Sequence, residues 1–229
     1  MGRVYERLFA IEGGDGAGKG TQTKALTGYL EQQGHDVLTM SFPRYGNPTA
    51  STVEMYLRGE FGPANSVAPE LASAAFLLDR IGAAPDIANF FETHPEGIGV
   101  FDRYVASNAA HQAAKIPKLG DRIRFYQHTL EQEYEAFSLP KPKRSIVLLV
   151  PTDIAQSNVD SKGDRSYTTA KRDVHEADAD HLNNTLRNYQ ELCELFPDEF
   201  TAIWAVDRTI HKMRPIDDIQ AEIREVIGV

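Results

Sequence analysis

Cysteine is nearly absent from this 229-residue chain, and so are long apolar runs. The single cysteine, Cys193, allows no internal disulfide and no cysteine-based metal site, which suits a reducing compartment. Apolar runs such as 146–150 are too short to span a bilayer, and the start of the chain lacks the pattern of a secretory signal. We therefore expect a cytoplasmic protein with no membrane contact.

Positive charge is also scarce, because 24 Lys and Arg residues stand against 33 Asp and Glu residues and leave a formal net charge of −9. Surfaces that bind nucleic acid present clustered Lys and Arg, so this composition argues against a nucleic-acid partner. Small polyanions would have to be held by a few placed cations. With 41% hydrophobic and 25% charged residues, the chain is expected to fold as one domain over residues 1–229.

Short β-type runs alternate with stretches that carry helical signals, and no internal repeat interrupts this order. The five expected strands are Leu8–Glu12, Val37–Phe42, Ile98–Asp102, Ile146–Val150 and Ala202–Val206. The clearest expected helices are Lys19–Gln33, Pro69–Phe91, Asp173–Phe196 and a last helix through Ile219–Ile227. This alternation predicts an α/β fold of three layers, in which a five-stranded parallel sheet is flanked by helices and binds ligands at the carboxyl ends of its strands.

A glycine-rich loop follows the first expected strand and opens the first expected helix, which is the context of a phosphate-binding loop. The loop consists of Gly13, Gly14, Asp15, Gly16, Ala17, Gly18, Lys19, Gly20 and Thr21. Glycines let the backbone wrap around phosphate oxygens, the helix adds its positive end, and Lys19 can reach the β- and γ-phosphates. The loop predicts a P-loop NTPase fold that binds the phosphates of a nucleotide, and a glycine-rich turn without phosphate is the plainer alternative.

One position departs from the general phosphate-loop pattern, because Gly20 stands where a Ser or Thr usually contacts Mg²⁺. Thr21 is therefore expected to contact phosphate, and its contact with the metal is left open. At the end of the third strand, Asp102 can hold Mg²⁺ through water and Arg103 can clamp a transferring phosphoryl group. A surface salt bridge is the plainer interpretation of this pair. Asp15 and Asp102 are the two candidate metal residues.

Several motifs are shared with one family. They are EGGDGAGKGTQ at 12–22, FPRYG at 42–46, FLLDR at 76–80 and DRYVASNAAHQ at 102–112, followed by an Arg- and Lys-bearing loop before Asp173. Together they resemble the thymidylate kinase family, in an arrangement closer to bacterial members than to animal ones. The resemblance covers nearly the whole chain and implies ATP as phosphoryl donor, Mg²⁺ as cofactor, dTMP as acceptor and a homodimer as the assembly.

The resemblance also implies roles for individual residues around the acceptor. Asp15 should approach its 3′-hydroxyl, Arg44 should hold its 5′-phosphate, and Phe76 should stack on its base. Arg80, at i+4 from Phe76 on the same helix face, should hydrogen-bond the thymine carbonyl. From spacing alone, a core Phe beside a surface Arg is the simpler alternative. The expected substrate contacts are Asp15, Phe42, Arg44, Tyr45, Phe76, Arg80, Arg103, Ser107, Asn108, His111, Asp173 and His175.

Within this set, the resemblance implies that Ser107 and Asn108 read the base edge and that Arg103 bridges toward the phosphates. Two histidines depart from the family pattern, because His111 and His175 stand where relatives often carry tyrosine. The tyrosine at the first of these positions crowds the 2′ carbon of the sugar. A histidine is smaller and can hydrogen-bond, so the discrimination between ribose and deoxyribose is left open.

A polar stretch at about 158–173 is expected to form a mobile lid, and a soluble basic loop is its plainer interpretation. Because the phosphate loop carries no arginine, the family pattern implies that the lid supplies the further catalytic one. Arg165 is the preferred candidate and Arg172 the second, with Lys162 and Lys171 in support. The expected catalytic residues are Lys19, Arg103, Arg165 and Asp15.

Two other functions compete with phosphorylation of dTMP. A kinase of the same fold could use dUMP, a purine monophosphate or several deoxynucleotides as its acceptor. From a different class, a GTP-dependent switch or nucleotide-binding protein is suggested by 161–164, which loosely mimics a guanine-reading element in the wrong structural context. For the expected homodimer, an apolar helix face around Leu71, Ala75 and Leu78 is the candidate contact, although these residues could equally belong to the core.

Overall fold

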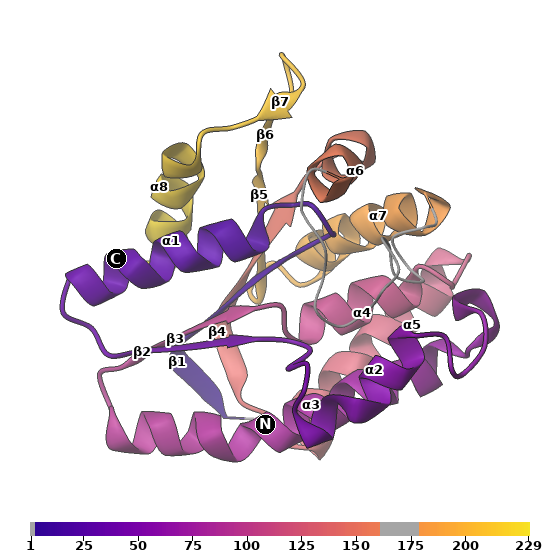
Figure 1. Cartoon of the computed structure of the whole chain (residues 1–229), viewed down its shortest axis with the longest axis horizontal. Coiled ribbons are helices and arrows are strands. Elements are labelled where there is room, and N and C mark those ends of the chain that lie inside the picture. The colour runs from indigo at the N-terminus through magenta and orange to yellow at the C-terminus, as the bar shows by residue number, and fades with distance from the viewer. Residues whose placement is uncertain (1–2, 161–178) are drawn as a thin grey trace.

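The computed structural model describes residues 3–160 and 179–229. A five-stranded sheet forms its centre, and Figure 1 shows its place among the helices. The strands follow the order β2-β3-β1-β4-β5, and every neighbouring pair is parallel. Their bounds are β1 Val4–Gly13, β2 Val37–Ser41, β3 Ile98–Asp102, β4 Lys141–Leu149 and β5 Phe200–Trp204. The predicted five-stranded parallel sheet is therefore confirmed.

Eight helices of the described chain surround the sheet. They are α1 Lys19–Gln32, α2 Ser51–Leu57, α3 Pro69–Thr93, α4 Val105–Ala113, α5 Leu119–Glu131, α6 Thr152–Asp160, α7 Ala179–Leu195 and α8 Ile216–Ile227. Shorter elements are the 3-10 turns η1 Pro48–Ala50 and η2 Ala64–Ser66, the π-helical turn η3 Gln132–Ala136, and an antiparallel pair, β6 Val206–Asp207 with β7 Lys212–Met213. Among residues 3–160 and 179–229, no helix combines the length and apolar character that a bilayer crossing demands.

Strand β1 shows why helices cover both faces of the sheet. Leu8 and Ala10 point into an apolar cluster with side chains of α3, α4, α5 and α7, whereas Phe9 and Ile11 point into a second cluster with α1 and α8. Successive residues of a strand face opposite sides of the sheet, so a strand that is apolar throughout must be covered on both faces. Figure 1 shows the resulting layers, with α1 and α8 on one side of the sheet and α3, α4 and α7 on the other.

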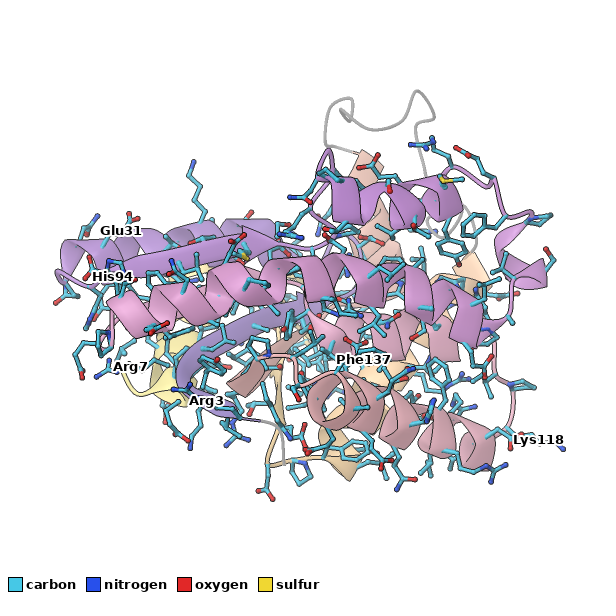
Figure 2. All side chains as sticks on the ribbon, turned by 90° about the horizontal axis from the view of Figure 1, so that it is seen from below. Arg3, Arg7, Glu31, His94, Lys118 and Phe137 are labelled. Carbon is cyan, nitrogen blue, oxygen red and sulfur yellow. The ribbon has the colours of Figure 1, made fainter. Side chains whose placement is uncertain are left out.

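The carboxyl ends of the parallel strands gather at one end of the molecule. Helix α1 begins there, directly after the loop that follows β1, and runs away from it. Glu31, near the end of α1, and His94, just after α3, lie together at one end of the molecule, while Lys118 lies at the other (Figure 2). The loops that follow β1, β2 and β3 are therefore brought to a shared edge, where ligands of such sheets bind.

Candidate active site

The phosphate loop owes its shape to close packing against β4 and α6. Gly16 has a φ of +78°, and a Cβ there would lie 2.0 Å from the carbonyl oxygen of Ala155. The side chain of Asn158 donates a hydrogen bond from Nδ2 to the Gly16 oxygen over 2.9 Å. A residue with a side chain would clash and would also favour a different backbone. Helix α1 follows at Lys19, which places the positive end of a helix beside the loop.

Lys19 lies inside this loop with only 7% of its surface exposed. Its Nζ donates to the Gly14 carbonyl oxygen over 2.7 Å. Burial lowers the pKa of Lys19 to about 8 and the nearby Arg103 adds to the effect, although Asp15 and Asp102 oppose it. Because the Lys19 ammonium is already desolvated, little further desolvation of this cation would be needed when a phosphate binds beside it.

Arg103 joins the phosphate loop to the end of β3. Its backbone adopts the left-handed conformation, with a φ of +68°, which is uncommon outside glycine and marks a position held by its surroundings. The guanidinium forms an ion pair with Asp15 and donates from Nη1 to the Gly13 carbonyl oxygen and to Ser107 Oγ, each over 3.1 Å. Burial opposes its charge, but Asp15 together with Tyr189, Asp102 and Glu12 outweighs this effect and raises the pKa of Arg103.

Glu12 is linked to Arg103 through the hydroxyl of Ser107. Sequence analysis did not predict it as a site residue. It is fully buried at the end of β1 and accepts hydrogen bonds from the Tyr104 amide over 2.8 Å and from Ser107 Oγ over 2.5 Å. Ser107 also bonds to the hydroxyl of Tyr189 on α7 over 2.9 Å. Desolvation raises the pKa of Glu12, and the Ser107 hydroxyl counteracts this. A charged residue that interrupts an apolar strand just before the loop was the signal that could have identified it.

Arg44, in the loop after β2, is held by helix α3. Its Nε donates to Asp79 Oδ1 over 2.9 Å, its backbone amide donates to Asp79 Oδ2 over 2.8 Å, and its Nη2 donates to Thr49 Oγ1 over 2.7 Å. Phe42 does not line this loop, because it packs in the core against Phe101 at 5.7 Å between ring centroids. Tyr45 lies on the surface. The structure thus brings Arg44, but not Phe42, to the edge of the site.

Arg80 and Asn108 come together where α3 meets α4, through the carboxylate of Glu133. Arg80 is only 2% exposed, so the alternative of a surface arginine is wrong. Its Nε and Nη2 each lie 2.6 Å from a carboxylate oxygen of Glu133, which opposes the cost of burial and raises the pKa of Arg80. Asn108 donates from Nδ2 to the same carboxylate over 2.9 Å. Phe76 is half-buried and meets Tyr56 edge-on at 6.0 Å between ring centroids.

Two amide side chains on α4 keep buried polar atoms without a hydrogen-bond partner among the described residues. They are Asn108, through Oδ1, and Gln112, through both Oε1 and Nε2. The two residues are four apart and share one face of the helix. Buried polar groups are nearly always satisfied in native proteins, and leaving one unpaired is costly. These atoms can therefore hydrogen-bond a polar ligand or an ordered water at this face of α4.

His111 packs on the α7 side of α4. It is buried, and its ring lies 5.8 Å from that of His181 and 6.1 Å from that of Tyr189, centroid to centroid. Its Nε2 lies 3.4 Å from Nη1 of Arg103. The histidine at the position where the resemblance implies a tyrosine thus contacts the arginine that joins the phosphate loop to α4.

Part of the expected site lies outside the described residues. This applies to Arg165, Arg172, Lys162, Lys171, Asp173 and His175, and to the guanine-like element at 161–164. Of the stretch expected as a lid, only 158–160 is described, and it forms the end of α6.

Asp102 fits a magnesium ion better than Asp15 does. Asp15 is paired with Arg103, whereas a Cβ on Gly20 would lie 3.2 Å from Asp102 Oδ2, so the glycine leaves room beside this carboxylate at the start of α1. Within residues 3–160 and 179–229, no cluster of three or more His, Cys, Asp or Glu could hold a metal ion. A single carboxylate with phosphates and water is a common Mg²⁺ environment. The donor set therefore fits a metal that arrives with a nucleotide.

A parallel sheet of order β2-β3-β1-β4-β5, a phosphate loop after the central strand and an arginine at the end of its neighbour define the class of P-loop nucleotide kinases. Comparison with known proteins narrows the class. The thymidylate kinase family model matches residues 11–214. This chain therefore belongs to the thymidylate kinase family.

Individual relatives agree with the family model. The chain is 36% identical to the thymidylate kinase of Mycobacterium tuberculosis (strain ATCC 25618 / H37Rv) over 188 aligned residues. The aligned region covers 81% of this chain and 85% of that protein. A probable thymidylate kinase of Archaeoglobus fulgidus is 27% identical over 224 residues, or 96% of this chain and 94% of the relative. The thymidylate kinase of Bifidobacterium longum subsp. infantis is 26% identical over 222 residues, with 96% and 88% covered.

Proposed function

We propose that this chain transfers the γ-phosphoryl group of ATP to dTMP, giving dTDP and ADP. The observation that carries the proposal is the position of Arg103, which contacts the phosphate loop through Gly13 and Asp15 and the acceptor-side helix α4 through Ser107. An arginine fixed between two anion sites is what phosphoryl transfer requires, because the protein mainly positions two anions and neutralises their charge.

On the donor side, the loop amides and Lys19 bind the ATP phosphates. A Mg²⁺ ion held at Asp102 would supply further positive charge on these phosphates. In the reaction, an oxygen of the acceptor phosphate attacks the γ-phosphorus, the bond to the bridging oxygen breaks, and ADP leaves with the electron pair. Arg103 stabilises the charge that develops on the transferred group. We keep Arg165 as the proposed lid arginine, with Arg172 as the second candidate.

On the acceptor side, Arg44 holds the 5′-phosphate and Phe76 stacks on the base. Asn108 has its Nδ2 engaged by Ser73 and Glu133, which leaves its Oδ1 as a hydrogen-bond acceptor. The imide N–H of thymine or uracil is a donor of matching polarity, whereas cytosine presents an acceptor at the same ring position. The unpaired amide of Gln112 lies on the same helix face and can address a base carbonyl. These contacts favour a pyrimidine imide.

The test is ADP formation from Mg²⁺-ATP with each nucleoside monophosphate in turn, including dUMP and the ribonucleotide of thymine. We expect the highest kcat/KM with dTMP. Arg103→Ala should lower kcat by about 10²- to 10³-fold, as the loss of a charge-stabilising donor does. Arg124→Ala, at an exposed arginine on α5, should leave turnover unchanged.

Other outcomes separate the competing functions. Higher kcat/KM with a monophosphate whose base is neither thymine nor uracil keeps the fold and mechanism but rejects the proposed contacts of Phe76, Arg80 and Asn108. Turnover of the thymine ribonucleotide equal to that of dTMP shows that His111 does not exclude a 2′-hydroxyl. GTP hydrolysis that is independent of any acceptor would support a switch and reject the kinase.

We further propose a homodimer, a cytoplasmic location and a single domain. Leu71 and Leu78 on α3 are 55% and 48% exposed, which supports a contact through this face, whereas Ala75 is only 2% exposed and belongs to the interior. Large apolar side chains that gather on one exposed face are typical of an interaction surface. The composition and the scarcity of cysteine support the location.

A further inference from the structure

Glu133 occupies an unusual place in the fold. It lies in the π-helical turn η3 that ends α5, and it and its neighbour Tyr134 are both buried although they are adjacent in the chain. A π-helical turn inserts an extra residue into a helix and is frequent at functional sites. Here the turn directs a carboxylate into the interior, where it meets two residues of the proposed base site.

The carboxylate of Glu133 receives three donors. Nε and Nη2 of Arg80 each approach to 2.6 Å, and Nδ2 of Asn108 approaches to 2.9 Å. Two of these donors belong to α3 and one to α4, so Glu133 connects both helices that carry expected base contacts. A surface residue could not do this, because exposed ion pairs are loosely held.

The position of Asn108 Nδ2 fixes which end of the amide is which. Besides Glu133, it faces the carbonyl oxygen of Ser73 at 3.2 Å and Ser73 Oγ at 2.8 Å. Carboxylate and carbonyl oxygens only accept hydrogen bonds, so the NH₂ end must point toward them. Oδ1 is then forced to the opposite side, where it is buried without a partner among the described residues. Removal of the carboxylate would weaken this preference and allow the amide to flip.

The same carboxylate orients Arg80. Pairing through Nε and Nη2 uses one edge of the planar guanidinium and leaves Nη1 as a donor on the opposite edge. One buried group therefore fixes both a donor and an acceptor. Thymine presents the complementary pair, a carbonyl oxygen beside an imide N–H, and cytosine presents the reverse.

We propose that Glu133 is a positioning residue that sets the preference for an imide base by fixing the orientations of Arg80 and Asn108. This inference rests on the proposed function, because it concerns the acceptor of that reaction. It assigns Glu133 no contact with the substrate. Its loss should therefore change which base is accepted, mainly through the KM of the acceptor, and should change kcat less.

The experiment compares kcat/KM for dTMP and for dCMP in the wild type and in Glu133→Gln. We expect the ratio of kcat/KM for dTMP to kcat/KM for dCMP to fall at least about tenfold in the variant, because this ratio measures how differently the enzyme binds the two transition states. The fall should come from a higher KM for dTMP. Glu133→Asp keeps the charge but shortens the side chain, and its ratio should be intermediate; it serves as the readout if Glu133→Gln does not fold.

Glu191→Gln is the matched control. Glu191 forms a similar two-oxygen pair with Arg122, at 2.9 and 2.6 Å, between α5 and α7 and away from α3. This variant should lose thermal stability and keep the wild-type ratio. An unchanged ratio in the folded Glu133 variant, or an equal fall in Glu191→Gln, overturns the inference alone. A wild type that does not prefer dTMP to dCMP rejects the proposed function, and the inference with it.

Discussion

At the scale of single residues, Lys19 carries a buried ammonium whose charge changes close to neutral pH. Because its pKa is lowered to about 8, the free protein should lose this charge as the pH rises above that value. We expect kcat/KM for ATP to fall about tenfold per pH unit above pH 8, since this ratio reports the free enzyme. Bound phosphates raise the pKa again, so kcat should persist to higher pH.

The measurement is the pH profile of both constants, with circular dichroism to show that the protein stays folded. The contribution of Lys19 to the free energy of unfolding should rise with pH, whereas kcat/KM for ATP falls. Because the folded pKa lies below the ordinary value of 10.5, the unfolded chain binds more protons between the two, and the cost of burying Lys19 declines as the pH rises through that window. Lys115, whose pKa is also lowered to about 8 by burial, is the control: Lys115→Met should keep the profile of kcat/KM. A flat profile to about pH 9.5 would contradict the prediction.

Gly16→Ala should damage the phosphate loop itself. The added Cβ would lie 2.0 Å from the Ala155 oxygen, in a left-handed backbone that costs an alanine about 1–2 kcal/mol before any clash. We expect the melting temperature to fall by at least about 4 °C. Gly14→Ala is the control, because nothing lies within 4 Å of a Cβ there. Calorimetry that finds equal losses in the two variants would show that packing against α6 does not shape the loop.

Sequence patterns predicted the residues of this loop because they are consecutive. They could not predict the partners of Arg44 and Arg80, which lie 35 and 53 positions away in Asp79 and Glu133. Nothing in local spacing indicates that an arginine on a helix face will be buried by an acidic residue from a distant turn. The identities of the ligand-facing residues could therefore be proposed from motifs, but the carboxylates that orient them required the fold.

At the scale of secondary structure, apolar strands were the easiest elements to predict. The main errors are the starts of β1 and β4, which begin at Val4 and Lys141 and not at Leu8 and Ile146, because Lys141 and Pro142 pair with Val4 and Tyr5. Such pairing depends on a partner far along the chain. Helix α4 had no distinct signal: almost all of its residues are buried, so it lacks the polar face on which helical periodicity depends.

Helix α3 approaches the turn η1 so closely that only a glycine fits between them. A Cβ on Gly82 would lie 2.4 Å from Thr49 Oγ1, the atom that accepts a hydrogen bond from Arg44. Gly82→Ala should therefore displace Thr49 and loosen Arg44, and we expect about a tenfold higher KM for the acceptor with little change in the KM for ATP, because small displacements at a distance can misplace a binding group.

Steady-state kinetics with each substrate varied in turn will check this prediction. Gly28→Ala in α1 is the matched control, since nothing lies within 4 Å of a Cβ there and alanine favours a helix by roughly 0.5–1 kcal/mol over glycine. An increase in both KM values, or in neither, would argue that η1 does not transmit the change to Arg44.

At the scale of the whole molecule, the order of strands and helices predicted the three layers and the edge at which ligands bind. The order of the elements could not predict which apolar residues are exposed to solvent. Leu71, Ala75 and Leu78 are all apolar residues of the kinds found in protein cores. The packing of α3 on α2 and α4 nevertheless buries only the alanine and leaves both leucines exposed. Exposure of this kind follows from the rotation of a helix about its axis, which a regular apolar pattern all around α3 does not specify.

The exposed leucines lead to the last prediction, which concerns assembly. In a two-fold dimer the same face of α3 meets its copy, so each substitution is present twice in the contact. Leu78→Glu would bury two unpaired carboxylates and should convert a dimer into a protomer of 25.5 kDa in light scattering at about 10 µM, because an unpaired buried charge costs several kcal/mol. Leu119→Glu, at an equally exposed leucine on α5, should leave the mass unchanged. If both variants and the wild type share the protomer mass, the α3 face has another role; if Leu78→Glu remains a dimer while folded, the contact lies elsewhere.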